Sequence, residues 1–169
     1  MTCRLAVRTG GSSMWTSLLR TQSPPATLLV RIAVGSIFLS EGLQKFIYPE
    51  ALGTGRFAKI GIPFPFLTGP FVGTVELVGG ALVLLGLLTR AAAVPLLVDM
   101  CVALLSTKLP ILLGHGFWGF AAPSAAPGFW GMTHEARTDF SMLLGSLFLL
   151  IEGAGPWSLD AWLAEPRRE

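Results

Sequence analysis

The fold is decided by residues 71–113, which read FVGTVELVGGALVLLGLLTRAAAVPLLVDMCVALLSTKLPILL. A bilayer core about 30 Å thick is crossed by a helix of about 20 apolar residues. This stretch supplies two such segments, 71–88 and 91–113, separated only by Thr89 and Arg90. Because the turn between them is so short, we predict that the two helices run antiparallel as a hairpin in the membrane.

Two further apolar segments flank this hairpin. They are LLVRIAVGSIFLSEGLQKFI at 28–47 and DFSMLLGSLFLLIEGAG at 139–155. The whole chain of 169 residues is 52% hydrophobic and only 13% charged, whereas soluble domains carry about 25% charged residues. We therefore predict an all-α, polytopic membrane protein, an antiparallel four-transmembrane-helix bundle. Its membrane domain covers 28–163, with a disordered N-terminal tail at 1–27 and a C-terminal tail at 164–169.

Composition and motifs exclude several classes of protein. The formal net charge of +2 is no signature of nucleic-acid binding. Cys3 and Cys101 are the only cysteines, and no C-x-x-C occurs, which argues against thiol exchange within the chain. His115 and His134 have no third ligand at a metal-binding spacing, so no metal site is predicted. The sequence also lacks haem-attachment and dinucleotide-binding motifs.

The distribution of basic residues predicts the orientation in the membrane. One side would hold seven of them: Arg4, Arg8, Arg20, Arg31, Arg90, Arg167 and Arg168. The other side would hold five, in two long loops: Lys45, Arg56, Lys59, Lys108 and Arg137. We predict that both termini are cytoplasmic.

Charged residues inside the spans point to a site, because each costs roughly 2.5–3.5 kcal/mol at the bilayer centre unless it is paired or turned inward. At 100° per residue, one face about 120° wide of the first span contains Arg31, Gly35, Phe38, Glu41, Gly42 and Lys45. In the second span, Glu76 lies on a stripe with Gly73 and Gly80, where another helix backbone can approach closely. Glu41 and Glu76 are expected at the same depth, since their helices run in opposite directions.

We expect further charged residues in the layer of these two carboxylates, namely Lys45, Lys108, Arg137 and Asp139. Together they predict a polar chamber, open outward and closed below by Leu, Val and Phe. On a regular helix Asp99 lies about 180° from Lys108 and would face elsewhere. We assign no role to Asp99 or Glu152.

Each charged residue has a structural alternative to a functional role. Arg31 is interpreted first as a snorkelling anchor, and Glu41 with Lys45 as either an i,i+4 ion pair or part of a site. Glu76 is either a clamp between helices or a proton donor.

The connection before the fourth span contains two Gly-Phe-Trp-Gly repeats, the first of which includes Trp118. Tryptophan at a membrane surface usually forms an interfacial belt. The alternative is a lid over a flat ring such as a quinone. His115 and His134 suit proton exchange or a hydrogen bond to a carbonyl group better than metal binding.

Five pieces in register resemble the DoxX family of small bacterial four-helix membrane proteins. They are GSIFLSEGLQK at 35–45, FAKIGIP at 57–63, VELVGGALVLLGLLTR at 75–90, TKLP with HGFW at 107–118, and GAGPWSLD at 153–160. The resemblance implies a place in the bacterial cytoplasmic membrane and in membrane redox systems linked to quinone, small sulfur compounds or oxidant defence. It carries over Arg31, Glu41, Lys45, Glu76 and Asp160 as functional positions.

Two functions remain open. The first is a subunit or accessory of a membrane redox system, working with a quinone and with a redox partner protein. Glu76 would then be the proton donor, assisted by Glu41, and the binding residues would be Arg31, Lys45, Lys108, His115, Trp118, His134, Arg137, Asp139 and Asp160. The second is a noncatalytic membrane scaffold or small-solute carrier. Beyond the lipid bilayer itself, self-association into a homo-oligomer is left open.

Overall fold

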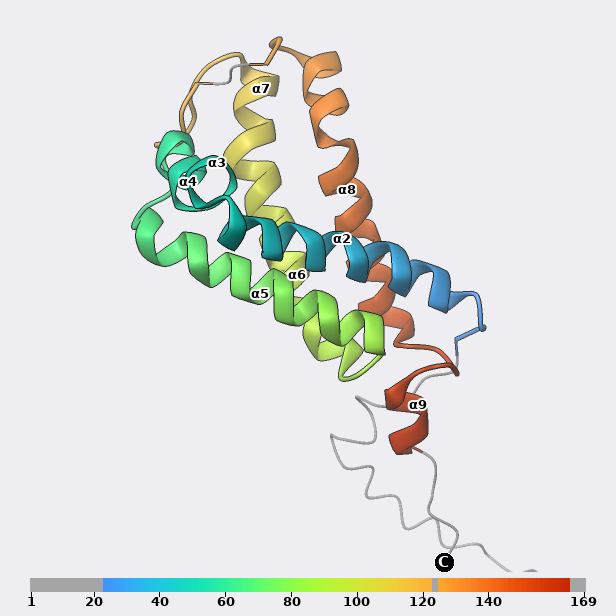
Figure 1. Ribbon diagram of the computed structural model, residues 1–169. Helices are drawn as coiled ribbons and strands as arrows, with labels where there is room; N and C mark the ends of the chain where they lie inside the picture. Colours follow the sequence, from blue (N-terminus) through green and yellow to red (C-terminus); the bar gives the residue numbers. More distant parts are fainter. Residues whose placement is uncertain (1–22, 123–124, 165–169) are drawn as a thin grey trace, which may run out of the picture.

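The computed structural model describes residues 23–122 and 125–164. In this part of the chain the regular structure is helical, and pairing of extended backbone is limited to an isolated bridge between Phe117 and Phe120. The helices (Figure 1) are α2 (Thr27–Ile47), α3 (Pro49–Leu52), α4 (Thr54–Ile60), α5 (Pro65–Leu85), α6 (Thr89–Ala103), the π-helical turn η1 (Leu104–Lys108), α7 (Leu109–Leu113), α8 (Phe129–Glu152) and α9 (Leu159–Ala164). The predicted tails lie mostly outside the described residues.

Three helical segments are long and apolar enough to cross a membrane: Thr27–Ile47, Pro65–Leu85 and Thr89–Leu113. They match the first three predicted spans. The fourth predicted span falls in α8, which has 24 residues but is not among these three. Its first half carries His134, Glu135 and Arg137, which lower its mean hydropathy. The all-helical membrane fold is confirmed, whereas the number of four spans stays a prediction.

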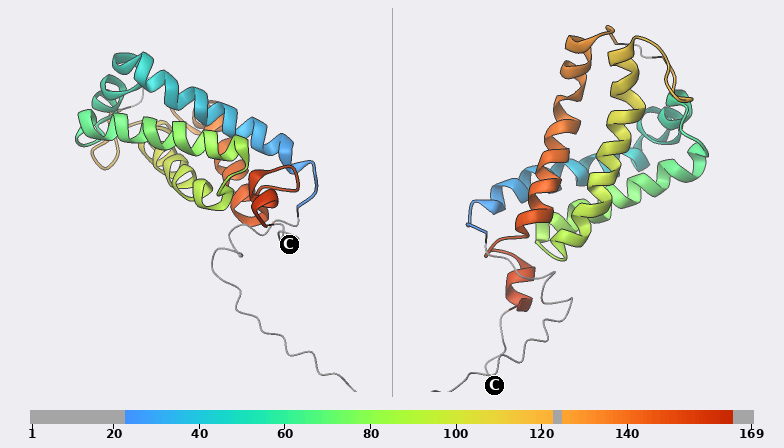
Figure 2. Two further views of the ribbon diagram at one scale, coloured as in Figure 1. Left: turned by 60° about the horizontal axis from the view of Figure 1, so that its bottom comes forward. Right: turned by 180° about the vertical axis from the view of Figure 1, so that it is seen from behind.

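The long helices form two antiparallel pairs. α2 packs chiefly on α5, and α6 packs chiefly on α8. The pairs cross each other and separate toward the end that carries α7, as Figure 1 and the right-hand view of Figure 2 show. The arrangement is thus more open than a bundle of four parallel axes, and the opening lies beside the short helices α3 and α4.

Glycines allow the backbones of α2 and α5 to touch. An added Cβ at Gly42 would lie 2.5 Å from the Leu77 nitrogen, and one at Gly80 would lie 2.5 Å from the Leu39 nitrogen. Real Cβ atoms do not approach a backbone so closely, so both positions require glycine. The predicted glycine stripe of α5 therefore packs against protein, and it fixes the face on which Glu76 lies.

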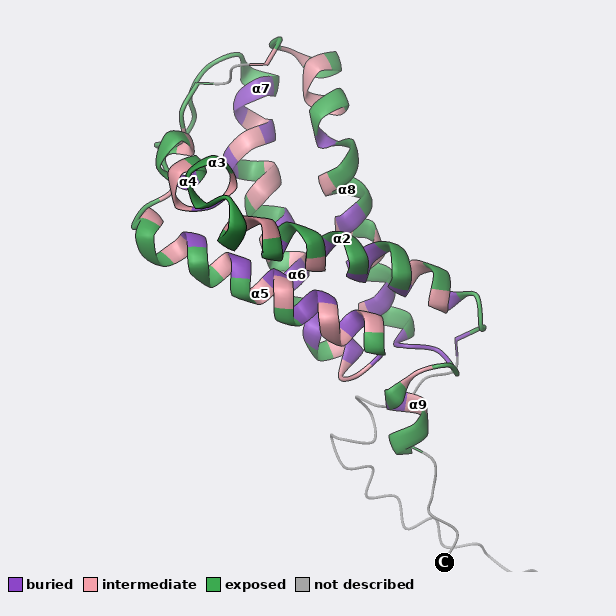
Figure 3. Cartoon of the chain, viewed as in Figure 1, coloured by how far each residue is buried: buried purple, intermediate pink, exposed green. Residues whose placement is uncertain are grey.

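The hydrophobic core lies where the two pairs cross. It consists of Val34, Phe38, Val83, Ala92, Ala93, Leu96, Met100, Met142 and Leu149. Figure 3 shows buried residues concentrated at this crossing, while the outer helix faces are mainly exposed. Exposed Leu, Ile and Phe side chains on these outer faces suit contact with lipid.

The interpretation of Arg31 as a snorkelling anchor is wrong, because its side chain is inside the protein and only 2% exposed. The guanidinium donates hydrogen bonds to the carbonyl oxygens of Val83 at 3.0 Å, Leu84 at 2.6 Å, Ala154 at 3.2 Å and Trp157 at 2.6 Å. The last carbonyls of a helix have no partner within it. Arg31 thus caps α5 and ties its end to the chain that follows α8.

Asp160 supports the same end of the molecule. Its carboxylate accepts the backbone N–H of Leu88 at 2.7 Å and of Thr89 at 3.0 Å, where α6 begins. A side-chain oxygen that accepts from the first N–H groups of a helix is an N-cap. Here it comes from α9, far along the chain. Arg31 and Asp160 therefore hold together the helix ends at the α9 end of the molecule.

Candidate functional site

A cavity of about 400 Å³ occupies the opening between the two helix pairs. Its walls come from α2, α3, α4, α5, α6, η1 and α8, together with Ile62 between α4 and α5. Phe38, Met100 and Met142 line it and also belong to the core, so they form its floor. A chamber with an apolar floor matches the expectation from the sequence, although methionine rather than leucine or valine accompanies the phenylalanine.

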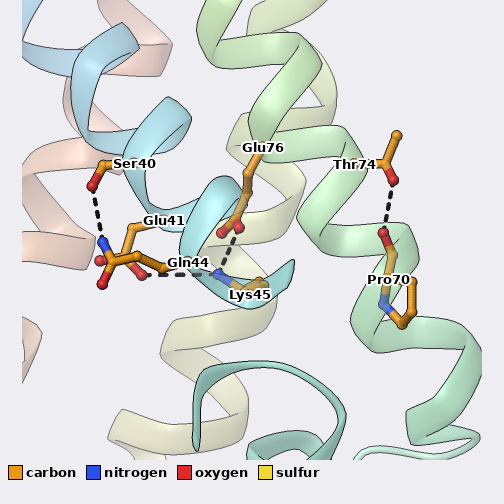
Figure 4. A network of polar contacts seen from close by, with 7 residues as sticks. All are labelled: Ser40, Glu41, Gln44, Lys45, Pro70, Thr74 and Glu76. Atoms are coloured by element: carbon orange, nitrogen blue, oxygen red, sulfur yellow. Dashed lines mark hydrogen bonds and ion pairs between the residues drawn. The ribbon is translucent and has the colours of Figure 1, made fainter. Parts of the chain in front are cut away.

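Lys45 is the centre of the charged groups in this cavity (Figure 4). Its Nζ lies 2.5 Å from Glu76 Oε2 and 3.9 Å from Glu41 Oε2. The side chains of Lys45 and Glu76 are 11% and 4% exposed, whereas that of Glu41 is 50% exposed. The structure therefore brings these three predicted residues together, and it makes the contact with Glu76 the tight and buried one.

Asp99 corrects the sequence interpretation. It lines the same cavity as Glu76, and the two carboxyl groups lie close enough to interact electrostatically. The sequence argument excluded Asp99 because it assumed a regular α-helix as far as Lys108. The turn η1 is π-helical, and each residue of such a turn advances by a smaller angle, so the two side chains are less far apart around the axis than predicted.

The π-helical turn has a local cause. Pro110 follows it and has no N–H to give to a carbonyl of the preceding turn. The hydroxyl of Thr107 bonds back to the Ala103 carbonyl at 2.6 Å, which supplies a partner within the widened turn. Such π-helical turns are frequent at functional sites. The prolines of this helix were visible in the sequence, but their effect on register was not.

Asp139 extends the series of charged groups to α8. It pairs with Lys108 at 3.3 Å, and its carboxylate acts electrostatically on Asp99. Charged side chains thus follow one another from α2 through α5 and α6 to α8. The sequence predicted Lys108 and Asp139 for this layer, and the structure brings both to it.

Acids outnumber bases around the cavity. Four carboxyl groups belong to the series: Glu41, Glu76, Asp99 and Asp139. The bases are Lys45, Lys108 and Arg56 of α4. Arg56 lines the cavity but was not among the predicted binding residues. Nothing in the local sequence indicated Arg56, because only the packing of a short helix brings it here. The described charged groups around the cavity thus include one carboxyl group more than bases.

Four predicted binding residues do not line the cavity. Arg137 is exposed, and its guanidinium bonds to the His134 carbonyl on the same helix at 2.5 Å. His134 and His115 are also exposed, and His115 Nδ1 lies 2.7 Å from the Gly116 carbonyl. Trp118 is 87% exposed in the loop between α7 and α8. Their chemistry is therefore not available inside the cavity of this structure, and a role for Trp118 as a lid stays a prediction. Arg31, Asp160 and Lys108 also lie outside the lining residues, although Lys108 pairs with Asp139, which lines the cavity.

Comparison with known proteins gives a consistent family. The sequence model of the DoxX family matches residues 26–109. The chain is 52% identical over 161 residues to "Uncharacterized membrane protein Rv3486" of Mycobacterium tuberculosis, with 95% of each chain covered. It is 32% identical over 143 residues to "Putative oxidoreductase CatD" of Bacillus subtilis, covering 84% of this chain and 90% of that protein.

A further relative is "Inner membrane protein YphA" of Escherichia coli, 30% identical over 141 residues, covering 81% of this chain and 89% of that protein. No solved structure gives a significant match. The similarities to these relatives extend over most of the chain.

Proposed function

Because the chain belongs to the DoxX family of membrane proteins, we propose that it is a component of a membrane redox system that binds a quinone in the cavity. The paired carboxyl groups of Glu76 and Asp99 supply a proton to it. The electrons come from a small sulfur compound or from a redox partner protein. We also propose that the protein lies in the bacterial cytoplasmic membrane with both termini inside.

The presence of Glu76 and Asp99 in one cavity lining, beside Lys45, carries this proposal. Two ionised carboxylates in one buried site repel each other, so such a pair favours a proton on one of them. Lys45 balances one negative charge of the pair from 2.5 Å. The pair thus stores a proton beside the cavity, in a site largely closed to water.

The lining of the cavity suits a quinone ring. A volume of about 400 Å³ falls within the range of small-molecule sites, which are mainly apolar with a few polar groups. Phe57, Ile60 and Val72 provide apolar walls for the ring. Lys45 and the protonated carboxyl group are hydrogen-bond donors for a quinone oxygen.

The reaction balances with a sulfur donor. Reduction of a quinone to the quinol takes two electrons and two protons, and oxidation of two thiosulfate ions to tetrathionate releases two electrons. Glu76 gives the two protons to the two quinone oxygens one after the other, and Glu41, half-exposed on the other side of Lys45, exchanges protons with water to refill the pair after each transfer. The printed name of the Bacillus subtilis relative, an oxidoreductase, supports this class of chemistry.

The experiment measures quinone reduction in proteoliposomes with thiosulfate as donor, together with quinone binding and thermal stability of the same preparation. Glu76→Gln keeps the shape of the side chain but cannot release a proton. We expect it to remain folded, to bind quinone, and to lose more than 90% of the activity. Glu135→Gln, at an exposed site on α8 outside the cavity lining, is the matched control and keeps its activity.

A second function is favoured by the way the charges join helices. Lys45 links α2 to α5, and Asp139 links α8 to η1, as in a noncatalytic scaffold or small-solute carrier. This alternative predicts that Glu76→Gln changes stability without a selective loss of quinone reduction. A wild-type protein that neither binds nor reduces quinone would contradict the redox proposal and favour the alternative.

A further inference from the structure

Resting on the proposed quinone site, we infer that the substrate is a quinone with a long isoprenoid tail, and that this tail lies in an apolar groove between α5 and α6. The groove has a volume of about 370 Å³ and adjoins the cavity, with which it shares the lining residue Phe71. It is lined on α5 by Phe71, Thr74, Val78 and Leu82, and on α6 by Ala91 and Pro95, among others.

The groove offers no polar partner to a ligand. Thr74 is the one polar side chain that lines it. Its hydroxyl donates to the Pro70 carbonyl of the preceding turn at 2.8 Å and is therefore already satisfied, as Figure 4 shows. A polar group placed in the groove would lose its hydrogen bonds to water without compensation. The occupant must be a hydrocarbon.

The groove also faces the membrane. Its lining residues belong to two segments that are apolar enough to span a bilayer. Phe71 and Val78 are 65% and 51% exposed, so the groove is open on its outer side. From Phe71 to Leu82 the helix rises roughly 17 Å at 1.5 Å per residue, which is enough for several isoprene units.

Phe71 connects the groove to the quinone cavity, because it lines both. A molecule with its ring beside Glu76 can pass Phe71 and lay its tail along the groove. The continuity with a polar site distinguishes a quinone tail from an ordinary acyl chain, whose headgroup would stay at the membrane surface.

The test compares a long-tailed menaquinone with its analogue that carries only a methyl group, in proteoliposomes of fixed lipid composition. Val78→Trp fills the groove. Val98→Trp places the same side chain on α6 at a position that is 55% exposed and lines neither cavity nor groove, so it is the matched control. We expect wild type and Val98→Trp to have at least a tenfold lower KM for the long-tailed quinone than for the short one, and Val78→Trp to lose this difference.

A second measurement does not depend on the variants. A menaquinone with a photoreactive group in its tail is cross-linked to the wild-type protein, and the labelled residues are mapped by mass spectrometry. Labels along residues 71–82 and 91–95 support the inference. Labels scattered over all outer helix faces would show that the tail binds without a specific site, as bulk lipid does, and would overturn the inference. Equal KM values for both quinones overturn it as well and leave the ring site intact. If neither quinone binds, the proposed function itself fails.

Discussion

The ion pair between Lys45 and Glu76 should contribute far more to stability than the pair between Lys45 and Glu41. Both pairs share the same ammonium group, but the distances are 2.5 Å and 3.9 Å, and Glu41 is 50% exposed where Glu76 is 4% exposed. Water screens an exposed pair to about 0.2–1 kcal/mol. Removal of one member of a buried pair strands the other charge and costs about 3–5 kcal/mol.

We therefore predict the outcome of two double-mutant cycles with Lys45→Met. The single change Lys45→Met lowers the free energy of unfolding by about 3–5 kcal/mol, because Glu76 loses its base. Combined with Glu76→Gln, the total loss is smaller than the sum of the single losses by about 2–3 kcal/mol. Combined with Glu41→Gln, the deviation from additivity stays below about 1 kcal/mol.

The measurement is reversible unfolding in mixed micelles of a mild detergent and dodecyl sulfate, followed by circular dichroism. Gln44→Ala serves as a control, since its side chain bonds only to Ser40 on the same helix, and the loss should be small. If the losses from Lys45→Met and Glu76→Gln add within about 0.5 kcal/mol, the two groups do not interact in the folded protein. The geometry of the cavity would then be wrong.

Three other predictions concern the framework and the topology. Arg31→Lys should cost about 3–5 kcal/mol, measured by the same unfolding assay, because an ammonium group cannot serve the four carbonyls that the guanidinium caps; a neutral change would refute the capping role. Gly80→Ala should lower the free energy of unfolding by about 1–3 kcal/mol, since the added Cβ would meet the Leu39 nitrogen. The control Ser36→Ala, at an exposed position, should change it by less than about 0.5 kcal/mol. Equal melting temperatures for the two variants would contradict the close approach of the helices. Reporter fusions after Gly55 and Ala125 should be external, and those after Arg90 and Glu169 cytoplasmic. An external reporter at Arg90 would reverse the topology. Reporters at Ala125 and Glu169 on the same side would show that α8 does not cross the membrane.

Local patterns account for much of what could be predicted. The apolar runs predicted the first three spans, because hydrocarbon requires helices of a given length and composition whatever their neighbours are. The periodicity of Gly73, Glu76 and Gly80 predicted the packed face of α5, because residues three and four apart share one side of a helix. The i,i+4 spacing likewise put Glu41 beside Lys45.

The remaining features depend on contacts between distant segments. The sequence showed Asp99 and Arg56 but not their place in the cavity. A π-helical turn changes the angle between Asp99 and Lys108, and Arg56 reaches the cavity through the docking of a short helix. The sequence suggested that Arg31 is a surface anchor, because its four carbonyl partners are distant in the chain. Two of them are more than 120 residues away. The sequence by itself determined that this chain folds as apolar helices with charges on their inner faces. Only the tertiary structure decided which charges meet, because a contact between two helices depends on their crossing and register, and neither is encoded in the periodicity of one helix.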